Sequence, residues 1–419
     1  MSNDIITFGC RLNIFESEII KKQLQISDTK DVAVFNSCAV TKEAERQLRQ
    51  SIRKYSKNNP DKKIIVTGCA AQINPEYYKQ LPGVDGVLGN NEKLYAENYK
   101  EVFSTEKNNI IVDDILKLKE TAEHMVTCFE GKCRAFLEIQ NGCNHRCTFC
   151  IIPFGRGNNR SVPITQIIKS CNELISRGYK EIVLTGVDIT DYGANLPGKP
   201  TLGYLIKEIF KFCPTLTRLR LSSLDVAEIN SELMELLKFE ERLLPHFHIS
   251  IQSGDDMILK RMKRRHNRKQ IYDFCNEIRK YRKDAAFGAD IIAGFPTETD
   301  EMFNNSLNLV RELQIPLLHI FPYSERDGTP AAKIPEKLQV PRHIRKERAR
   351  NLIAEGKIQL QNFTKSLLGK KVTAIVENNN TLTSEHFLKV QIENNSDIGS
   401  VHNIEITGMN NDNIIGKIV

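Results

Sequence analysis

Three cysteines stand within eight residues, at Cys143, Cys147 and Cys150, directly after the apolar run 135–139. A loop that follows a strand can wrap a metal centre, and thiolates bind soft iron and zinc strongly. Structural zinc and an ordinary cubane cluster each take four protein ligands, so a set of three leaves a cubane with one open iron. A zinc site that also uses His145, or scattered buried thiols, are the alternatives.

Alternating strand and helix patterns continue from residue 134 to residue 321. The predicted strands are 134–140, 181–185, 218–222, 247–251, 287–292 and 317–321. The predicted helices between them are 164–177, 202–212, 228–239, 256–282 and 299–313. Six such units predict an incomplete (βα)6 TIM-type barrel, whose chemistry lies at the carboxyl ends of the strands. The three-cysteine loop follows the first strand and therefore belongs to that face.

Polar and glycine-rich groups stand at the ends of other predicted strands. These are Gly186, Ser222, Ser223, Gln252, Asp290 and Gly294. Together on one rim they predict a ligand pocket, because hydrogen-bonding groups and close backbone approach converge there. Taken singly, each is typical of an ordinary turn. Asp290 fits equally well as a buried structural acid.

The first hundred residues also alternate between strands and helices. Strands are predicted at 4–9, 32–36, 64–67 and 84–88, and helices at 14–24, 42–56 and 75–80. This pattern predicts a doubly wound parallel sheet. Cys10, Cys38 and Cys69 each come just after a strand. Because the carboxyl ends of parallel strands lie side by side, these cysteines should converge into a second three-cysteine cluster. Three buried cysteines that only fill apolar space are the alternative.

The C-terminal part of the chain predicts a separate small domain. Short strands are predicted at 371–377, 385–392, 403–407 and 414–419, which suits a small β-barrel. The expected organisation is therefore an N-terminal domain (1–103), a linker (104–132), the central barrel (133–340), a basic helical connection (341–367) and the C-terminal barrel (368–419).

Charge and composition restrict the partners and the compartment. The net charge is +7, and Lys and Arg are concentrated in 46–63, 257–283 and 342–371. Basic clusters on helices are typical of a polyanion footprint, although solvated helix faces are often basic as well. No apolar run is long enough for a bilayer, and the N-terminus does not read as a secretory signal. Eleven cysteines without such a signal favour metal binding in a reducing cytoplasm.

The motifs around both cysteine sets resemble those of the radical S-adenosylmethionine (SAM) methylthiotransferases, and within them the MtaB-like branch. The carrying motifs are Phe8-Gly-Cys10-Arg-Leu-Asn13, Asn36-Ser-Cys38-Ala-Val-Thr41, Val66-Thr-Gly-Cys69, Gln140-Asn-Gly-Cys143 through Pro153, Ser250-Ile-Gln-Ser-Gly254 and Asp290-Ile-Ile-Ala-Gly-Phe-Pro296. Phe149, before the last cysteine of the loop, belongs to the radical-SAM signature.

The resemblance implies two [4Fe-4S] clusters and SAM as cofactors. Cys143, Cys147 and Cys150 would hold the cluster that binds and cleaves SAM, and Cys10, Cys38 and Cys69 the cluster that delivers a methylated sulfur. Phe149 and the rim residues Gly186, Ser222, Ser223, Gln252, Asp290 and Gly294 would contact SAM. The C-terminal barrel would be a TRAM-type domain that grips RNA; from its residues alone it could equally be a packing module.

The resemblance also implies a reaction. A 5′-deoxyadenosyl radical would remove hydrogen from C2 of N6-threonylcarbamoyladenosine beside the anticodon of tRNA, and a methylthio group would take its place. An electron donor such as flavodoxin or ferredoxin would be needed, and no membrane. Rival substrates are isopentenyladenosine in tRNA and an aspartate of a ribosomal protein. A rival of another class is a non-catalytic iron–sulfur or zinc protein that binds RNA.

Overall fold

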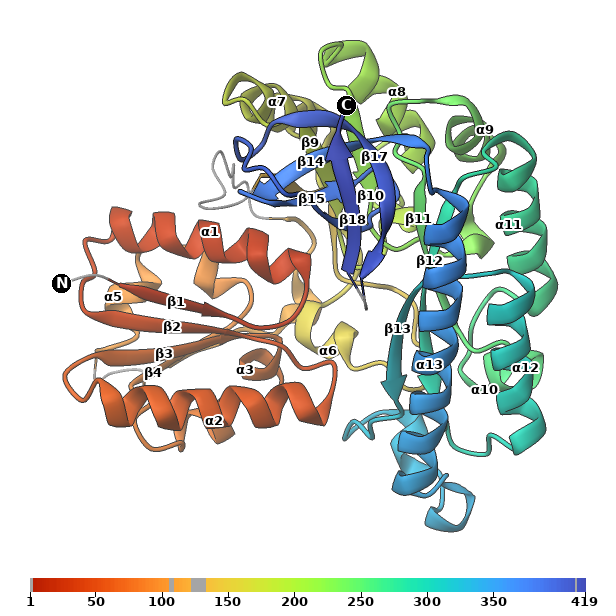
Figure 1. Ribbon diagram of the computed structural model, residues 1–419. Coiled ribbons are helices and arrows are strands. Elements are labelled where there is room, and N and C mark those ends of the chain that lie inside the picture. The colour runs from red at the N-terminus through yellow and green to blue at the C-terminus, as the bar shows by residue number, and fades with distance from the viewer. Residues whose placement is uncertain (1–2, 105–108, 122–132, 411–412) are drawn as a thin grey trace.

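The computed structural model describes residues 3–104, 109–121, 133–410 and 413–419. It contains an N-terminal α/β domain, a central curved sheet covered by helices and a small C-terminal barrel (Figure 1). The α/β fold class and the C-terminal barrel predicted from the sequence are both confirmed. No helix within these described ranges is long and apolar enough to cross a membrane.

The N-terminal domain is built on a parallel five-stranded sheet. Its strands are β1 (Asp4–Thr7), β2 (Val32–Ser37), β3 (Lys63–Gly68), β4 (Gly86–Leu88) and β5 (Ile110–Ile111). The helical segments are α1 (Arg11–Ile26), α2 (Lys42–Asn58), α3 (Cys69–Ile73), α4 (Pro75–Lys79), α5 (Asn98–Glu101) and the 3₁₀ turns η1 (Glu92–Leu94) and η3 (Ile115–Lys117). Strand β5 lies within the stretch that was expected to be linker, and it extends this sheet by pairing with β4.

Helices cover both faces of this sheet, as predicted, although its strand order is not that of a doubly wound sheet. Apolar residues of α1 and α5 pack on one face, and those of α2 and α4 pack on the other. The strands follow one another in the order β1-β2-β3-β4-β5, so this sheet has no reversal of strand order. Its ligand edge is therefore not a crevice at a switch point. The strand ends instead point toward the central domain (Figure 1).

The central domain is a six-stranded parallel half-barrel. Its strands are β6 (Ala135–Glu138), β9 (Glu181–Thr185), β10 (Arg218–Leu221), β11 (His246–Gln252), β12 (Ala286–Ala293) and β13 (Leu317–Pro322). Two three-stranded sheets, β6-β9-β10 and β11-β12-β13, are joined by bridges such as that between Leu224 and Ile249. A short hairpin of β7 (Gln140–Asn141) and β8 (Arg160–Ser161) flanks the three-cysteine loop.

Helices alternate with these strands, and apolar residues of most of them pack with the strands into the largest core of the described residues. They are α6 (Ile152–Arg156), α7 (Ile164–Ser176), α8 (Leu202–Phe212), α9 (Ser231–Phe239), α10 (Asp256–Arg261), α11 (Arg268–Tyr281) and α12 (Asp300–Glu312). The 3₁₀ turns are η4 (Ile189–Asp191), η5 (Val226–Glu228), η6 (Pro330–Lys333) and η7 (Glu336–Leu338).

Two helix predictions in this domain need correction. The single helix predicted at 256–282 is two helices, because Lys263 has a left-handed φ of 60° and Asn267 starts α11 with a capping box. The helix predicted at 228–239 starts at Ser231, where the Asn230 side chain accepts a hydrogen bond from Leu233 N.

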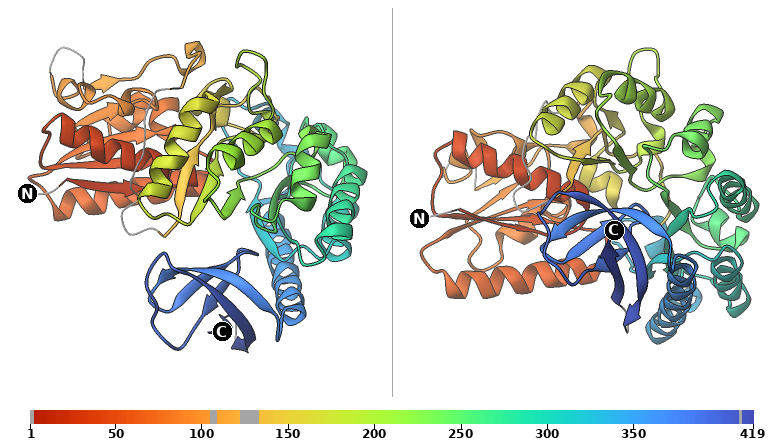
Figure 2. Two further views of the ribbon diagram at one scale, coloured as in Figure 1. Left: turned by 90° about the horizontal axis from the view of Figure 1, so that it is seen from above. Right: turned by 45° about the horizontal axis from the view of Figure 1, so that its top comes forward.

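Helix α13 (Arg342–Ser366) leads from the central domain into the C-terminal barrel (Figure 2). The closed barrel has the order β14-β15-β16-β18-β17. Its strands are β14 (Lys371–Asn378), β15 (Thr381–Ser384), β16 (Lys389–Gln391), β17 (Val401–Asn410) and β18 (Asn413–Ile418). The strand predicted at 385–392 is wrong over 385–388. These residues form a turn, in which Phe387 has a φ of 67°.

Candidate active site

The structure brings Cys10, Cys38 and Cys69 together at the ends of β1, β2 and β3. Cys10 is the N-cap residue of α1, and Cys69 is the first residue of α3. Gly9 has a φ of 97°, and a Cβ placed there would lie 3.0 Å from Cys38 Sγ. Glycine at this position therefore lets the Cys10 turn approach the Cys38 thiol.

The electrostatics of this trio fit a cationic metal centre. Burial, together with the neighbouring Cys69 and Cys10, raises the pKa of Cys38 to about 12. Without a metal the thiol stays protonated, whereas a cluster binds thiolates and its iron charge offsets their repulsion. The three sulfurs converge, and Cys10 is exposed. The donor set fits an iron–sulfur cluster with one iron left open.

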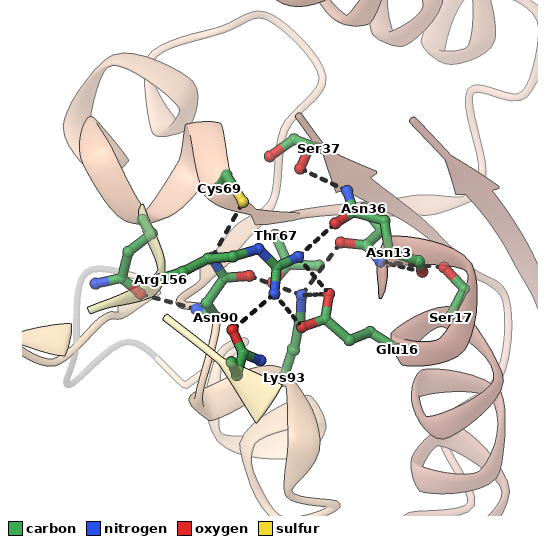
Figure 3. A network of polar contacts seen from close by, with 12 residues as sticks. Asn13, Glu16, Ser17, Asn36, Ser37, Thr67, Cys69, Asn90, Lys93 and Arg156 are labelled. Atoms are coloured by element: carbon green, nitrogen blue, oxygen red, sulfur yellow. Dashed lines mark hydrogen bonds and ion pairs between the residues drawn. The ribbon is translucent and has the colours of Figure 1, made fainter. Parts of the chain in front are cut away.

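A buried polar network holds this trio against the central domain (Figure 3). Arg156, at the end of α6, donates two hydrogen bonds to the Glu16 carboxylate, at 2.8 and 3.0 Å. Lys93 Nζ donates to the same carboxylate at 2.8 Å. Arg156 also donates to Asn13 Oδ1, and the Cys10 Sγ lies 3.9 Å from that oxygen. Asn90 Nδ2 lies 3.6 Å from Cys69 Sγ.

Because of this network, the segment that follows Cys143, Cys147 and Cys150 touches the set formed by Cys10, Cys38 and Cys69. A Cβ at Gly155 would lie 3.1 Å from the Cys69 Cβ, and Asn90 donates to the Gly155 carbonyl. Gly155 is only five residues beyond Cys150. The two cysteine sets therefore lie on adjoining surfaces of the two domains, joined through α6.

The other cysteine set, Cys143, Cys147 and Cys150, lies in the loop between β7 and α6. Cys143 N donates to Gly157 O at 3.1 Å, and Cys150 N donates to Cys147 O at 3.1 Å. Burial raises the pKa of Cys143 and raises that of Cys150 to about 12. These thiols also need a metal to become thiolates.

His145, the alternative ligand in a zinc site, is occupied by carboxylates. Its Nε2 lies 2.7 Å from Asp188 Oδ2 and 3.3 Å from Glu228 Oε1. Cys143, His145 and Asp188 do offer ligand atoms within 4.8 Å of one another. That set contains one cysteine of the loop, so it does not use the three-thiol pattern.

Arg264 is a site residue that the sequence interpretation missed. Its Nη1 lies 3.6 Å from Cys147 Sγ, while Nη2 donates to Asp225 Oδ2 at 2.9 Å and to Ser250 O at 3.0 Å. Arg264 therefore places a positive charge beside the Cys147 sulfur. In the sequence this arginine stands within the basic stretch 257–283, a pattern that is typical of a polyanion footprint and does not distinguish it from its neighbours.

The predicted rim residues fall into two groups. Gly186, Ser222 and Gln252 lie at the carboxyl ends of β9, β10 and β11. The buried Ser222 Oγ has no hydrogen-bond partner within the described residues, and Gln252 adopts a φ of 68° at a bulge. Ser223 follows Ser222 on the same rim and is partly exposed.

Asp290, Gly294 and Phe149 have other surroundings. Asp290 lies within β12 rather than at its end, and its Oδ1 is 3.1 Å from His248 Nε2 and 3.3 Å from His319 Nδ1. Although burial opposes ionisation, these two histidines hold the pKa of Asp290 below its usual value. Gly294, with a φ of 74°, faces Arg345, and the Phe149 ring packs edge-on against Phe295 with centroids 6.5 Å apart.

Comparisons with known proteins agree with this geometry. Residues 137–310 match the profile "Radical SAM superfamily", and residues 3–89 match "Uncharacterized protein family UPF0004". A "Threonylcarbamoyladenosine tRNA methylthiotransferase MtaB" from Rickettsia prowazekii is 55% identical, over 94% of this chain and 91% of that protein. The chain belongs to the radical-SAM tRNA methylthiotransferase family. A protein of the same name from Bacillus subtilis is 38% identical, over 83% of this chain and 78% of that protein.

Solved structures support the fold of this methylthiotransferase. The radical-SAM methyltransferase TsrM from Kitasatospora setae superposes with a TM-score of 0.53 at 13% identity, over 77% of this chain and 68% of that one. The family membership confirms the predicted resemblance, the enzymatic nature of the chain, and SAM and iron–sulfur clusters as its cofactors.

Proposed function

We propose that this methylthiotransferase inserts a methylthio group at C2 of N6-threonylcarbamoyladenosine, next to the anticodon of tRNA. The observation that carries the proposal is the pair of three-cysteine sets held on adjoining surfaces through α6. The relatives that share most of the chain are named for threonylcarbamoyladenosine in tRNA.

In this proposal each set of cysteines holds one [4Fe-4S] cluster. The bound cofactors supply a SAM-derived radical at one cluster and a methylated sulfur at the other. The protein's part is to bind, orient and exclude water. Cys143, Cys147 and Cys150 hold the cluster that binds SAM, with Arg264 beside Cys147. The rim groups Gly186, Ser222, Ser223 and Gln252 are the SAM-binding candidates, because they stand on the same edge of the half-barrel.

Asp290, Gly294 and Phe149 take different parts in this assignment. Asp290 is held by His248 and His319 and belongs to strand β12 of the half-barrel. Gly294 and Phe149 shape the wall of the site, since one faces Arg345 and the other packs on Phe295.

The tRNA-binding surface is proposed on the exposed side of α13 and on α2. Arg342, Lys346 and Arg350 recur every four residues on α13 and are exposed. This spacing places them on one helix face, which suits contact with a phosphate backbone. Not every basic residue of the sequence clusters faces outward. Arg345 and Arg348 are buried and pair with Glu325 and Glu298.

The electron donor is proposed to be a small acidic protein of the flavodoxin or ferredoxin type, in the cytoplasm. A pocket of about 230 Å³ reaches Cys147 and is lined by the basic side chains of Arg146, Lys263 and Arg265. Basic residues around the nearest approach to a cluster attract an acidic donor and speed its encounter.

Mass spectrometry of tRNA nucleosides from a deletion strain tests the function. We expect the 2-methylthio form of threonylcarbamoyladenosine to disappear, the unmethylthiolated nucleoside to accumulate, and the gene to restore the product. Loss of 2-methylthio-isopentenyladenosine instead would favour the second candidate. That candidate rests on relatives such as the "tRNA-2-methylthio-N(6)-dimethylallyladenosine synthase" of Ehrlichia canis, which is 32% identical.

A further inference from the structure

The turn between β15 and β16 inserts an aromatic side chain at the amino-terminal end of the central strands. Arg220 of β10 donates to the carbonyls of Glu385 and Ser384, at 3.0 and 3.2 Å. His386 Nε2 lies 2.9 Å from Asp284 Oδ2 and fixes the turn from its other side. Phe387 is held at a φ of 67°, which a bulky residue adopts only when its surroundings impose it.

Three guanidinium groups and one imidazole surround the Phe387 ring. The Cζ atoms of Arg11, Arg134 and Arg220 lie 5.1, 5.4 and 5.1 Å from its centroid. The His246 ring stacks on it at 4.8 Å with an interplanar angle of 20°. Arg11 comes from the N-terminal domain, Arg134 and His246 from the central domain, and Phe387 from the C-terminal barrel. All three domains therefore meet at this ring.

The carboxylates around Phe387 do not pair with all of the arginines there. Glu181 accepts hydrogen bonds from Arg218 and Arg220, and Glu377 is bonded to Arg134. Arg11 makes no hydrogen bond or ion pair to any residue that the structure describes, and its guanidinium makes a cation–π contact with Phe387.

Two further nitrogens in this cluster make no hydrogen bond. Arg134 Nη1 and His246 Nδ1 are buried without a hydrogen-bond partner in the described part of the chain, and Arg134 Nη1 is 3.7 Å from Glu181 Oε1. His246 is only 2% exposed. Burial, together with the nearby Arg220, His248 and Arg11, holds the pKa of His246 well below its usual value, so its ring is neutral. A buried group without a partner is costly unless a ligand supplies one.

Arg11 directly follows Cys10, so of these cations Arg11 is the one that adjoins the set Cys10, Cys38 and Cys69. A base that presents C2 to that cluster projects its N6 substituent several bonds beyond the ring. The threonylcarbamoyl group ends in a carboxylate, whereas an isopentenyl group carries no charge. A guanidinium without an acid is the group that favours the first substituent over the second.

We infer that Arg11, assisted by Arg134 and His246, binds the carboxylate of the N6 substituent and thereby selects a carboxylate-bearing adenosine. This inference rests on the proposed function and deepens it. It assigns substrate recognition to residues outside the SAM-binding rim and outside both cysteine sets.

Binding of anticodon stem-loops to the reconstituted holoenzyme without SAM tests the inference. One stem-loop carries N6-threonylcarbamoyladenosine, and the other carries its neutral carboxamide. We expect the wild type to prefer the acid by about 10- to 100-fold, the range for a hydrogen bond to a charged group. Arg11→Gln should reduce this preference to below about threefold, and Arg11→Lys should keep part of it because the charge remains. Arg177→Gln, which removes an exposed arginine paired with Glu173, is the matched control and should behave as wild type.

An acid preference that Arg11→Gln leaves unchanged, or its absence in the wild type, overturns the inference. Iron content and cluster absorbance are measured for each variant, because Arg11 is next to Cys10. If Arg11→Gln loses iron, Arg134→Gln supplies the same measurement away from both sets. It should lower the preference severalfold, and an unchanged preference overturns the inference. Methylthiolation assays are separate: a wild type that modifies only isopentenyladenosine refutes the proposed function, while the acid preference in binding still decides the role of Arg11.

Discussion

Replacing Glu16 with Gln should destabilise the junction between the N-terminal and central domains. The change keeps the shape of the side chain and removes its charge. Glu16 is 2% exposed, and the buried Arg156 and Lys93 both donate to it. In Glu16→Gln these two cations keep their burial and lose their common counter-charge.

The expected cost is about 3–5 kcal/mol of unfolding free energy, the range for breaking a buried ion pair from one side. The charge of the nearby Glu138 determines where within this range the cost in unfolding free energy falls. Burial, and then Glu16 itself, raise the pKa of Glu138 to about 7. Without Glu16, Glu138 ionises more readily and partly compensates Arg156. We therefore expect the lower end of the range at pH 8 and the upper end at pH 6.

Urea denaturation of the metal-free protein, followed by circular dichroism at pH 8 and pH 6, measures this cost. Glu43→Gln, at an exposed carboxylate bonded to Arg46, is the control and should leave the unfolding midpoint unchanged. A Glu16→Gln protein as stable as wild type at both pH values would refute the assignment of this carboxylate as the counter-charge. Although burial opposes it, Arg156 and Lys93 lower the pKa of Glu16 to about 2, from 4.5. Its contribution is thus present above about pH 4.5 and is lost as the pH falls toward 2.

Three further predictions concern activity, RNA binding and pH. Cys147→Ala should abolish SAM cleavage, measured as 5′-deoxyadenosine, whereas Cys38→Ala should retain cleavage and stop methylthiolation; equal loss of cleavage in both folded variants would contradict separate roles. Combined Arg342→Glu and Arg350→Glu should weaken tRNA binding about tenfold or more and reduce the salt slope by about 1 for each lost phosphate contact, and an unchanged slope would exclude α13 from the interface. Since the pKa of Glu138 is raised to about 7, stability should fall by on the order of 3 kcal/mol as the pH rises from 4.5 to above 7. Glu138→Gln should remove that dependence, and a pH profile identical to wild type would contradict it.

Much of the fold follows from local patterns that the sequence displays directly. The strands predicted at 181–185 and 218–222 are β9 and β10 nearly without change. The first contains the continuous apolar segment 182–184, as buried parallel strands often do, whereas in the second Leu219 and Leu221 alternate with arginines. The convergence of Cys10, Cys38 and Cys69 was also predictable, since parallel strand ends must meet at one edge.

Other features depend on packing between distant segments. Arg156 and Glu16 are 140 residues apart, and no local pattern pairs them. Arg264 lies in a basic run, and only the folded chain shows that it turns inward to Cys147. The turn at Phe387 was mistaken for strand, because its aromatic and apolar residues have strand propensity while its positive φ is imposed by contacts with Arg220 and His386.

The Phe387 turn gives the C-terminal barrel a second task besides any contact with RNA. Arg220 is 1% exposed and His246 2%, and the turn covers both of them. A chain truncated at residue 367 would lack this turn, and solvent would then reach the amino-terminal end of the half-barrel. Reactive intermediates survive only where water and stray reductants are kept out. The truncated protein should therefore cleave SAM without forming product, even where tRNA still binds.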